Sequence, residues 1–230
     1  MILRYIILVG SMAGLPACEH PREEPPTNTR SLPPETDRPA ILFLGTSLTA
    51  GLGVDPEQAY PALIQGKIDS AGLHFRVINA GVSGEISAGA LRRVDWLFRQ
   101  PISVLVVETG ANDGLRGLST DSLRANIQGI LDRAKQLRPS PQLVLIGMRV
   151  PPNYGRVYSA QFAALYRNLA EANHAALVPF LLQNVGGVPS LNQADGVHPT
   201  AAGQRIMAET VWRVLEPLLR KEVKTGTTEG

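Results

Sequence analysis

Short apolar runs alternate with longer stretches of helical periodicity between Ala40 and Leu219, and this alternation limits the chain to few folds. The first run, Ile41–Leu44, contains no polar residue and stops at Gly45, as expected of a strand covered on both faces. Strands that alternate with helices form parallel sheets through right-handed crossovers. We therefore predict an α/β fold with helices on both faces of a five-stranded parallel sheet. The other expected strands are Phe75–Ile78, Val104–Val107, Leu143–Ile146 and, in an outer position because of Pro179, Leu177–Phe180.

The segments between these runs have the 3.6-residue period of amphipathic helices. In the clearest example, apolar residues recur on one face from Leu123 to Leu137, after the N-cap candidates Ser119 and Thr120. Trp96 and Trp212 fall within two other helical segments, and we expect both to anchor the core. The remaining helical segments are expected near 60–71, 91–98, 158–175 and 206–218.

The N-terminus differs from the rest of the chain. An apolar run from Tyr5 to Leu15 follows Arg4 and is too short for a comfortable membrane span, which is typical of a signal peptide. We predict a cleaved signal peptide over residues 1–17. The four residues that end at Cys18 resemble a bacterial lipobox, and lipidation would explain the only cysteine of an exported chain. Ordinary secretion with cleavage nearby is the alternative.

Residues 18–39 are rich in Pro, Glu, Arg and Thr and have almost no large apolar side chains, so they cannot bury enough surface to fold. Their proline content favours an extended, disordered tether. A polar, flexible tail is likewise expected over residues 221–230. The folded domain is thus predicted over residues 40–220, in a periplasmic protein whose only membrane contact is the lipid on Cys18.

Polar or glycine residues follow three of the predicted strands. Ligands of parallel sheets bind outside the carboxyl ends of the strands, so these positions are where chemistry is expected. Ser47 stands between Gly45 and Gly51, which permit a sharp turn and leave the serine exposed over the sheet edge. Gly84 can present a bare N–H, and Asn112 offers an uncharged amide donor suited to an oxyanion. Each also has an ordinary interpretation as a cap or turn residue.

Asp195 and His198 lie three residues apart, just before the last amphipathic segment. An acid this close can orient the imidazole from the same loop, and a serine from elsewhere would complete an acyl-transfer triad. The motif is weak by itself. The interpretation of this motif as catalytic is strengthened because Ser47, Gly84 and Asn112 are expected at the same edge of the sheet.

Five blocks of the chain, taken together, resemble the ordered motifs of SGNH hydrolases, also called GDSL esterases. The resemblance is strongest to the bacterial branch of thioesterase I, lysophospholipase L1 and arylesterase, and it covers essentially the whole folded part. It implies a flavodoxin-like, three-layer α/β/α fold. The blocks are Gly45–Gly51, Val82–Gly84, Gly110–Gly117, Arg149–Gly155 and Asp195–Pro199.

Carried over position by position, the resemblance implies that Ser47 is the nucleophile. His198 would act as general base and then general acid, with Asp195 as its orienting carboxylate. The oxyanion hole would consist of the Ser47 N–H, the Gly84 N–H and the Asn112 side chain.

Two further positions matter for this resemblance. In the family, the loop that corresponds to Arg149–Tyr158 lies near the acyl site, so Pro152, Asn153 and Tyr154 are expected to bind substrate. Where the family motif has Asp before the serine, this chain has Thr46. A carboxylate could accept several backbone N–H bonds there that a hydroxyl replaces only in part, so the serine turn is expected to be held less rigidly.

The predicted function is therefore a serine esterase for aryl or acyl esters, with acyl thioesters and lysophospholipids left open as substrates. We expect a monomer that needs no cofactor and no metal, since no two histidines or acids other than the pair in use have metal-ligand spacing. A formal net charge of only +2, spread along the chain, does not indicate a nucleic-acid partner.

Three other functions agree with parts of the sequence. A lipoprotein that keeps this fold but only binds ligands is the main one, with Thr46 as an early sign of lost catalysis. A nucleotide binder is disfavoured because the chain has no Gly-x-x-x-x-Gly-Lys-Ser/Thr loop and Gly51-Leu-Gly53 lacks the third glycine of the dinucleotide motif. An α/β-hydrolase is disfavoured because no Gly-x-Ser-x-Gly elbow occurs.

Overall fold

The structure is a computed structural model that describes residues 37–226. The predicted signal peptide, Cys18 and nearly all of the tether lie outside the described residues. Within this range, no helix is both long and apolar enough to cross a bilayer.

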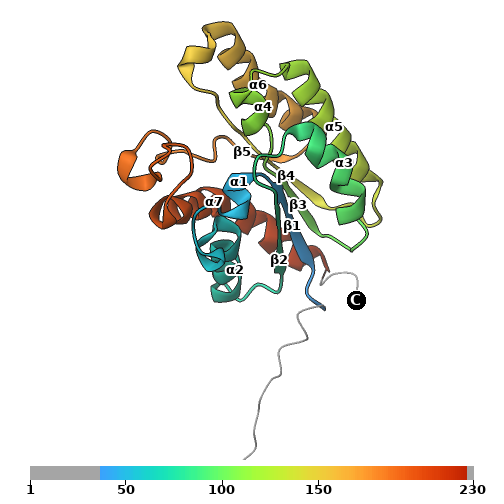
Figure 1. Cartoon of the computed structure of the whole chain (residues 1–230). Helices are drawn as coiled ribbons and strands as arrows, with labels where there is room; N and C mark the ends of the chain where they lie inside the picture. Colours follow the sequence, from blue (N-terminus) through green and yellow to red (C-terminus); the bar gives the residue numbers. More distant parts are fainter. Residues whose placement is uncertain (1–36, 227–230) are drawn as a thin grey trace, which may run out of the picture. The chain divides into compact units, whose positions relative to one another are not determined.

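Five parallel strands form one sheet in the order β2-β1-β3-β4-β5 (Figure 1). This order is that of flavodoxin-like folds, and it confirms the predicted α/β class with a central five-stranded parallel sheet. The outermost strand β5 ends at Val178, directly before Pro179, which cannot donate a hydrogen bond to a neighbouring strand. The strands are β1 (Ala40–Gly45), β2 (Arg76–Gly81), β3 (Val104–Val107), β4 (Gln142–Ile146) and β5 (Ala176–Val178).

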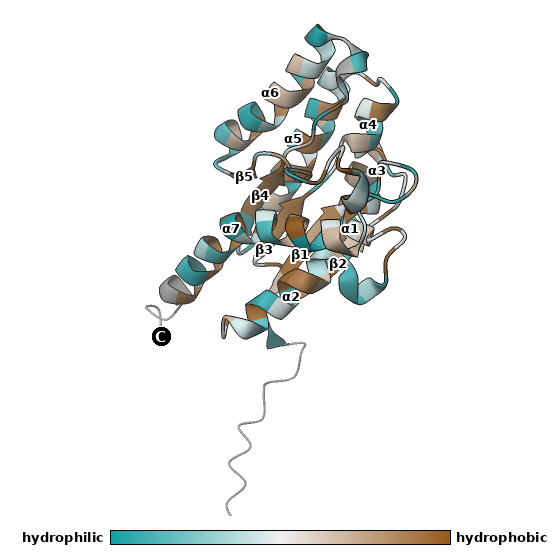
Figure 2. Ribbon diagram, turned by 90° about the vertical axis from the view of Figure 1, so that its left-hand side faces the viewer, coloured by the Kyte–Doolittle hydropathy of each residue, from teal (hydrophilic) through white to brown (hydrophobic). Residues whose placement is uncertain are grey.

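Helices cover both faces of the sheet and make the three layers. On one face α3 (Ser87–Leu97), α5 (Thr120–Gln136) and α6 (Arg156–Asn173) pack side by side, and on the other α2 (Tyr60–Ser70) packs against α7 (Ala201–Gly226) (Figure 1). The apolar core lies between the layers, where the brown strands of Figure 2 are enclosed by helices with teal outer faces. The short elements are α1 (Ser47–Ala50), α4 (Ala111–Leu115), η2 (Pro56–Gln58), η3 (Pro152–Tyr154) and η4 (Pro189–Leu191).

Helix α5 begins where the sequence predicts it to begin. The Ser119 hydroxyl accepts hydrogen bonds from the backbone N–H groups of Asp121 at 3.2 Å and Ser122 at 3.4 Å, which satisfies two of the unpaired donors of the first turn. The face predicted to be apolar is buried at Leu123, Ile127, Ile130, Leu131 and Ala134.

The structure corrects the predicted ends of two elements. β2 runs three residues past its expected end, because Asn79, Ala80 and Gly81 continue to pair with β1. Helix α7 continues to Gly226, so residues 221–226 are helical where we expected a flexible tail. The lysines and glutamate after residue 219 favour helix, which explains the extension of α7.

Trp96 is also corrected. Its side chain is 66% exposed on α3, so it does not anchor the core. The buried positions of this helix include Ala90, Val94 and Leu97, and Trp96 falls outside their stripe. Trp212 is partly buried and packs against the core, as expected.

Candidate active site

Ser47 begins helix α1 directly after β1. The chain turns tightly here, because Gly45 has no room for a side chain: a Cβ at this position would lie 2.0 Å from Thr49 Oγ1. Gly51 ends the helix with φ of 74°, a conformation that glycine adopts without steric cost. Ser47 is only 8% exposed, so a substrate must enter a cleft to reach its hydroxyl.

The loop before α7 brings an imidazole and a carboxylate to this serine. His198 Nε2 lies 2.9 Å from Ser47 Oγ, and His198 Nδ1 lies 2.6 Å from Asp195 Oδ2. The other oxygen of Asp195 accepts the backbone N–H groups of Val197 at 2.9 Å and His198 at 3.0 Å. Hydrogen bonds from the backbone and ring of His198 hold the pKa of the Asp195 carboxyl well below its usual range. Asp195 is therefore ionised throughout the pH range in which histidine side chains ordinarily gain or lose a proton.

The same loop is closed by its own hydrogen bonds. The Gln193 N–H donates to the His198 carbonyl at 2.7 Å, and Asn192 forms a β-bridge with Pro199. The Gln193 side-chain amide also donates to the Leu52 carbonyl at 2.7 Å. The loop is thereby fixed against the turn that follows α1, which explains how an exposed segment can hold a defined geometry.

The two predicted oxyanion donors outside the serine turn lie beside each other. The Asn112 amide, at the start of α4, donates to the Glu85 carbonyl at 3.0 Å, and the Arg116 guanidinium donates to the Gly84 carbonyl at 3.0 Å. Gly84 has φ of 77°, so the turn needs glycine for its backbone conformation. Arg116 was not singled out from the sequence, and it positions this turn.

A cavity of about 200 Å³ opens beside Ser47, Asn112 and His198. Apolar side chains make up most of its remaining wall, as expected for a site that receives an acyl or aryl group. The wall includes Leu48, Leu115, Met148, Leu182 and Val197.

The loop after β4 contributes to this cavity at positions other than those we predicted. Its lining residues are Arg149 and Pro151. Pro152, Asn153 and Tyr154 form η3, and of these Asn153 and Tyr154 do not line the cavity. The Tyr154 hydroxyl donates to the Leu115 carbonyl at 2.7 Å, so this tyrosine supports a wall residue.

Comparison with known proteins identifies the family. The model of the GDSL-like lipase/acylhydrolase family matches residues 43–206, which include every residue of the described site. The chain belongs to this family.

Relatives within this GDSL-like family carry names of related activities. Esterase TesA of Pseudomonas aeruginosa is 41% identical over 180 residues, covering 78% of this chain and 89% of the relative. The thioesterase 1/protease 1/lysophospholipase L1 of Escherichia coli K12 is 37% identical over 184 residues, covering 79% and 86%. The crystal structure of TesA matches with a TM-score of 0.74 and 39% identity, over 78% of this chain and 99% of that chain.

The departure from the GDSL-like motif at Thr46 is accompanied by a contact that we did not predict. Both the N–H and the hydroxyl of Thr46 donate to the buried carboxylate of Glu108, at the end of β3. Asn79 adds a second support, since its amide donates to the Thr49 carbonyl at 2.8 Å. The only sequence signal for either residue is that it is polar and follows an apolar run.

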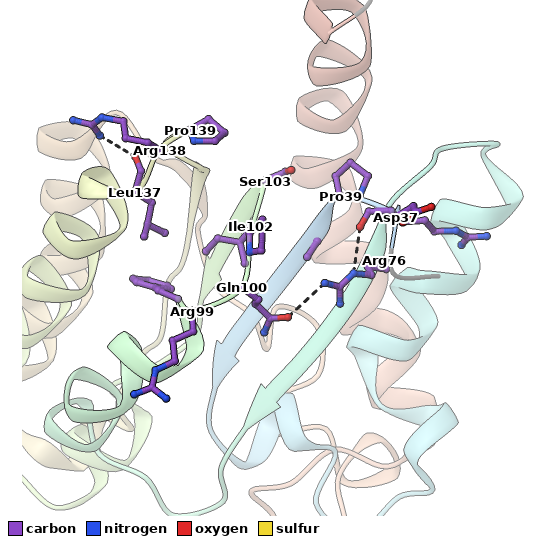
Figure 3. A pocket seen from close by; sticks show the side chains of 14 residues that line it. Asp37, Pro39, Arg76, Arg99, Gln100, Ile102, Ser103, Leu137, Arg138 and Pro139 are labelled. Carbon is purple, nitrogen blue, oxygen red and sulfur yellow. Dashed lines mark hydrogen bonds between the residues drawn. The ribbon is translucent and has the colours of Figure 1, made fainter. Parts of the chain in front are cut away.

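A second cavity lies at the opposite edge of the sheet, near the amino ends of the strands (Figure 3). Ile102 and Leu137 are among its lining residues, together with Arg76, whose guanidinium donates to Gln100 Oε1 at 3.4 Å. The predicted catalytic and oxyanion residues lie at the carboxyl edge and are not among the residues that line this cavity. In this family member the chemistry is therefore to be sought at the carboxyl edge.

Proposed function

We propose that the protein is a serine hydrolase of carboxylic esters, with Ser47 as nucleophile, His198 as general base and Asp195 as the orienting acid. The observation that carries this proposal is the continuous set of contacts from Ser47 Oγ through the imidazole to the carboxylate, at 2.9 and 2.6 Å. Ser47 and His198 line a mostly apolar cavity. Membership in the GDSL-like lipase/acylhydrolase family supports the same function.

The proposed reaction has two halves. Ser47 Oγ attacks the acyl carbonyl while His198 Nε2 takes the serine proton, and the negative oxygen is stabilised by the Ser47 N–H, the Gly84 N–H and the Asn112 amide. The imidazolium then returns the proton to the leaving alcohol or thiol, which leaves an acyl-serine. Water repeats the sequence and releases the carboxylic acid. Asp195 keeps the imidazole proton on Nδ1 and stabilises its charged form throughout.

The substrate class follows from the cavity and the relatives. An apolar cavity accepts acyl and aryl groups, and the names of the relatives include esterase, thioesterase and lysophospholipase. We therefore propose aryl and acyl esters as substrates, with acyl thioesters and lysophospholipids as related ones.

The experiment that tests this function uses purified protein lacking residues 1–36, since residues 37–226 contain the complete sheet and both helical layers. Hydrolysis is measured on p-nitrophenyl esters of two to twelve acyl carbons, an acyl-coenzyme A and a lysophospholipid. Turnover on at least one ester well above that of Ser47→Ala supports the proposal. Rates for both proteins no higher than the uncatalysed rate on every substrate would indicate a ligand-binding protein instead.

Loss of the Asn112 amide is expected to lower kcat by about 100-fold, with little change in KM, because the donor acts on charge that develops in the transition state. Asn112→Ala is compared with wild type on the best ester. Because this amide also bonds Glu85, circular dichroism and a thermal melt establish that the variant is folded. A change confined to KM would assign Asn112 to ground-state binding.

We also propose export to the periplasm and attachment to the membrane through a lipid on Cys18, a monomeric enzyme at the bilayer surface. The basis is the sequence of the first 39 residues, which resembles a lipoprotein signal followed by a tether. Expression of the full chain in a Gram-negative host should place the protein in the membrane fraction, and Cys18→Ser should release it. Recovery of both proteins in the soluble periplasm would indicate ordinary secretion.

A further inference from the structure

A buried carboxylate lies beneath the serine turn and takes no part in the reaction steps above. Glu108, the residue after β3, is 1% exposed. Its Oε2 accepts the Thr46 N–H at 2.8 Å and the Thr49 hydroxyl at 2.8 Å, and its Oε1 accepts the Thr46 hydroxyl at 3.0 Å. All three donors come from the two residues that flank Ser47 and Leu48. One carboxylate therefore holds both sides of the turn that carries the nucleophile.

The same cluster connects the serine turn to the loop of the histidine. The Thr49 hydroxyl is 2.8 Å from the Tyr60 hydroxyl, and the Tyr60 N–H donates to Gln204 Oε1 at 2.9 Å. The Gln204 N–H in turn donates at 2.9 Å to the carbonyl of Thr200, two residues after His198. Contacts thus run from the carboxylate to the residues on either side of Ser47 and Leu48 and, through Tyr60 and Gln204, to the segment that follows His198.

The carboxylate also packs against the backbone of β1. A Cβ on Gly45 would lie 2.8 Å from Glu108 Oε2, so the carboxylate occupies the space that a side chain would take. A group enclosed in this way cannot exchange its partners for water. Its three donors have a charged, strong acceptor only while the carboxyl group is ionised.

We propose that Glu108 is a positioning residue whose ionised form sets the orientation of Ser47 toward His198, so that turnover depends on an ionisation beneath the nucleophile as well as on the imidazole. Protonation places a hydrogen on one carboxyl oxygen, which then competes with the Thr46 and Thr49 hydroxyls as a donor. The turn loses a strong acceptor and its fixed geometry. This inference rests on the proposed function, because it concerns the same serine.

The surroundings make this ionisation relevant near neutral pH. Burial raises the pKa of Glu108 to about 7, and the hydrogen bonds from Thr46 and Thr49 oppose that rise. The tyrosines that interact with it, Tyr60 and Tyr166, are buried with pKa values raised well above 10, so they stay neutral in the working range. The cation Arg93 donates to the carbonyl of Gly45, the glycine next to the carboxylate, and to that of Ala80, and it pairs with Glu85.

The test is the pH profile of kcat from pH 5 to 9, recorded by pH-stat titration on a neutral ester. Because protonated Glu108 should lose about as much activity as an uncharged replacement, log kcat of wild type should fall on the acidic side more steeply than that of Glu108→Gln over the first ten-fold loss of activity. Glu108→Gln should remove this extra steepness and lower the plateau kcat about 10-fold, with KM within about 2-fold. The control Glu216→Gln, on the surface of α7, should reproduce the wild-type profile.

A Glu108→Gln profile that is parallel to wild type, with equal kcat, would overturn the proposal. If that variant does not fold, Thr49→Val keeps the carboxylate and removes one of its donors. Because this donor favours the charged form, its loss should move the acidic limb to higher pH, and an unmoved limb would also overturn the proposal. Ser47→Ala keeps the two proposals apart. An inactive Ser47→Ala with a Glu108→Gln profile equal to wild type refutes only the positioning role of Glu108, whereas a Ser47→Ala variant as active as wild type refutes the proposed role of Ser47 as nucleophile.

Discussion

Replacing Ser47 with alanine is expected to lower kcat by about 10⁴-fold or more, to the level of uncatalysed or oxyanion-assisted hydrolysis. Its hydroxyl oxygen lies 2.9 Å from His198 Nε2, and Ser47 lines the apolar cavity. Without it no acyl-enzyme can form, so the covalent route is lost whatever the substrate. Binding of the ester should persist, since the apolar wall is unchanged.

Two measurements make this prediction specific to Ser47. The matched control Ser70→Ala removes a hydroxyl that bonds only the Gly66 carbonyl on the surface of α2, and it should keep wild-type turnover. A fluorophosphonate should label wild type and the control, and mass spectrometry should place the adduct on the peptide of Ser47. Labelling at a different serine, or turnover retained by Ser47→Ala, would contradict the proposed mechanism.

Replacing Asp195 with asparagine is expected to lower kcat by about 10³- to 10⁴-fold while leaving the fold intact. The Asp195 carboxylate accepts a hydrogen bond from the protonated Nδ1 of His198, at 2.6 Å. An amide nitrogen in the same place would instead donate a hydrogen bond to Nδ1. The imidazole would then carry its proton on Nε2 and could not act as base toward Ser47. Asparagine can still accept the Val197 and His198 backbone N–H groups through its oxygen, so the loop should stay closed.

A lower kcat with an intact fold would show that Asp195 orients the base His198, whereas a loss of stability would show that Asp195 supports the loop. The thermal midpoint of Asp195→Asn should match wild type, and Asp121→Asn, which alters an exposed acid of α5, should change neither kcat nor stability. The depressed pKa of Asp195 adds a second expectation: its ionisation should be absent from the acidic limb of the wild-type profile above pH 5. A fall in kcat that follows a fall in thermal midpoint would instead assign Asp195 to the loop structure.

Particular elements show why the fold could be predicted. The runs that became β1 and β3 are buried at every position, and such runs are recognisable because both faces of a central parallel strand are covered. Trp96 shows the limit of the same reasoning. Its helix and an apolar face that includes Val94 and Leu97 were predicted, and both residues are buried. Trp96 lies outside that face, and a large apolar side chain need not be buried because of its size alone.

Some residues of the site could likewise be predicted from the sequence, and others could not. Ser47 and Asn112 could be placed at one edge because the carboxyl ends of parallel strands meet there. Asn153 and Tyr154, which were expected to bind substrate, do not line the cavity, whereas Arg149 and Pro151 of the same loop do. The conformation of an irregular loop depends on contacts with other segments, which no local pattern records.

The sequence by itself determined the α/β class, the family motifs and the chemical identity of the reactive groups, because burial periodicity and side-chain type are local properties of the chain. Only the tertiary structure decided how the missing acid before the serine is replaced. Thr46 meets Glu108 across 62 residues, and His198 meets Ser47 across 151. Such contacts depend on the register of strands and the packing of loops, so the serine turn, expected to be held loosely, has a buried carboxylate beneath it.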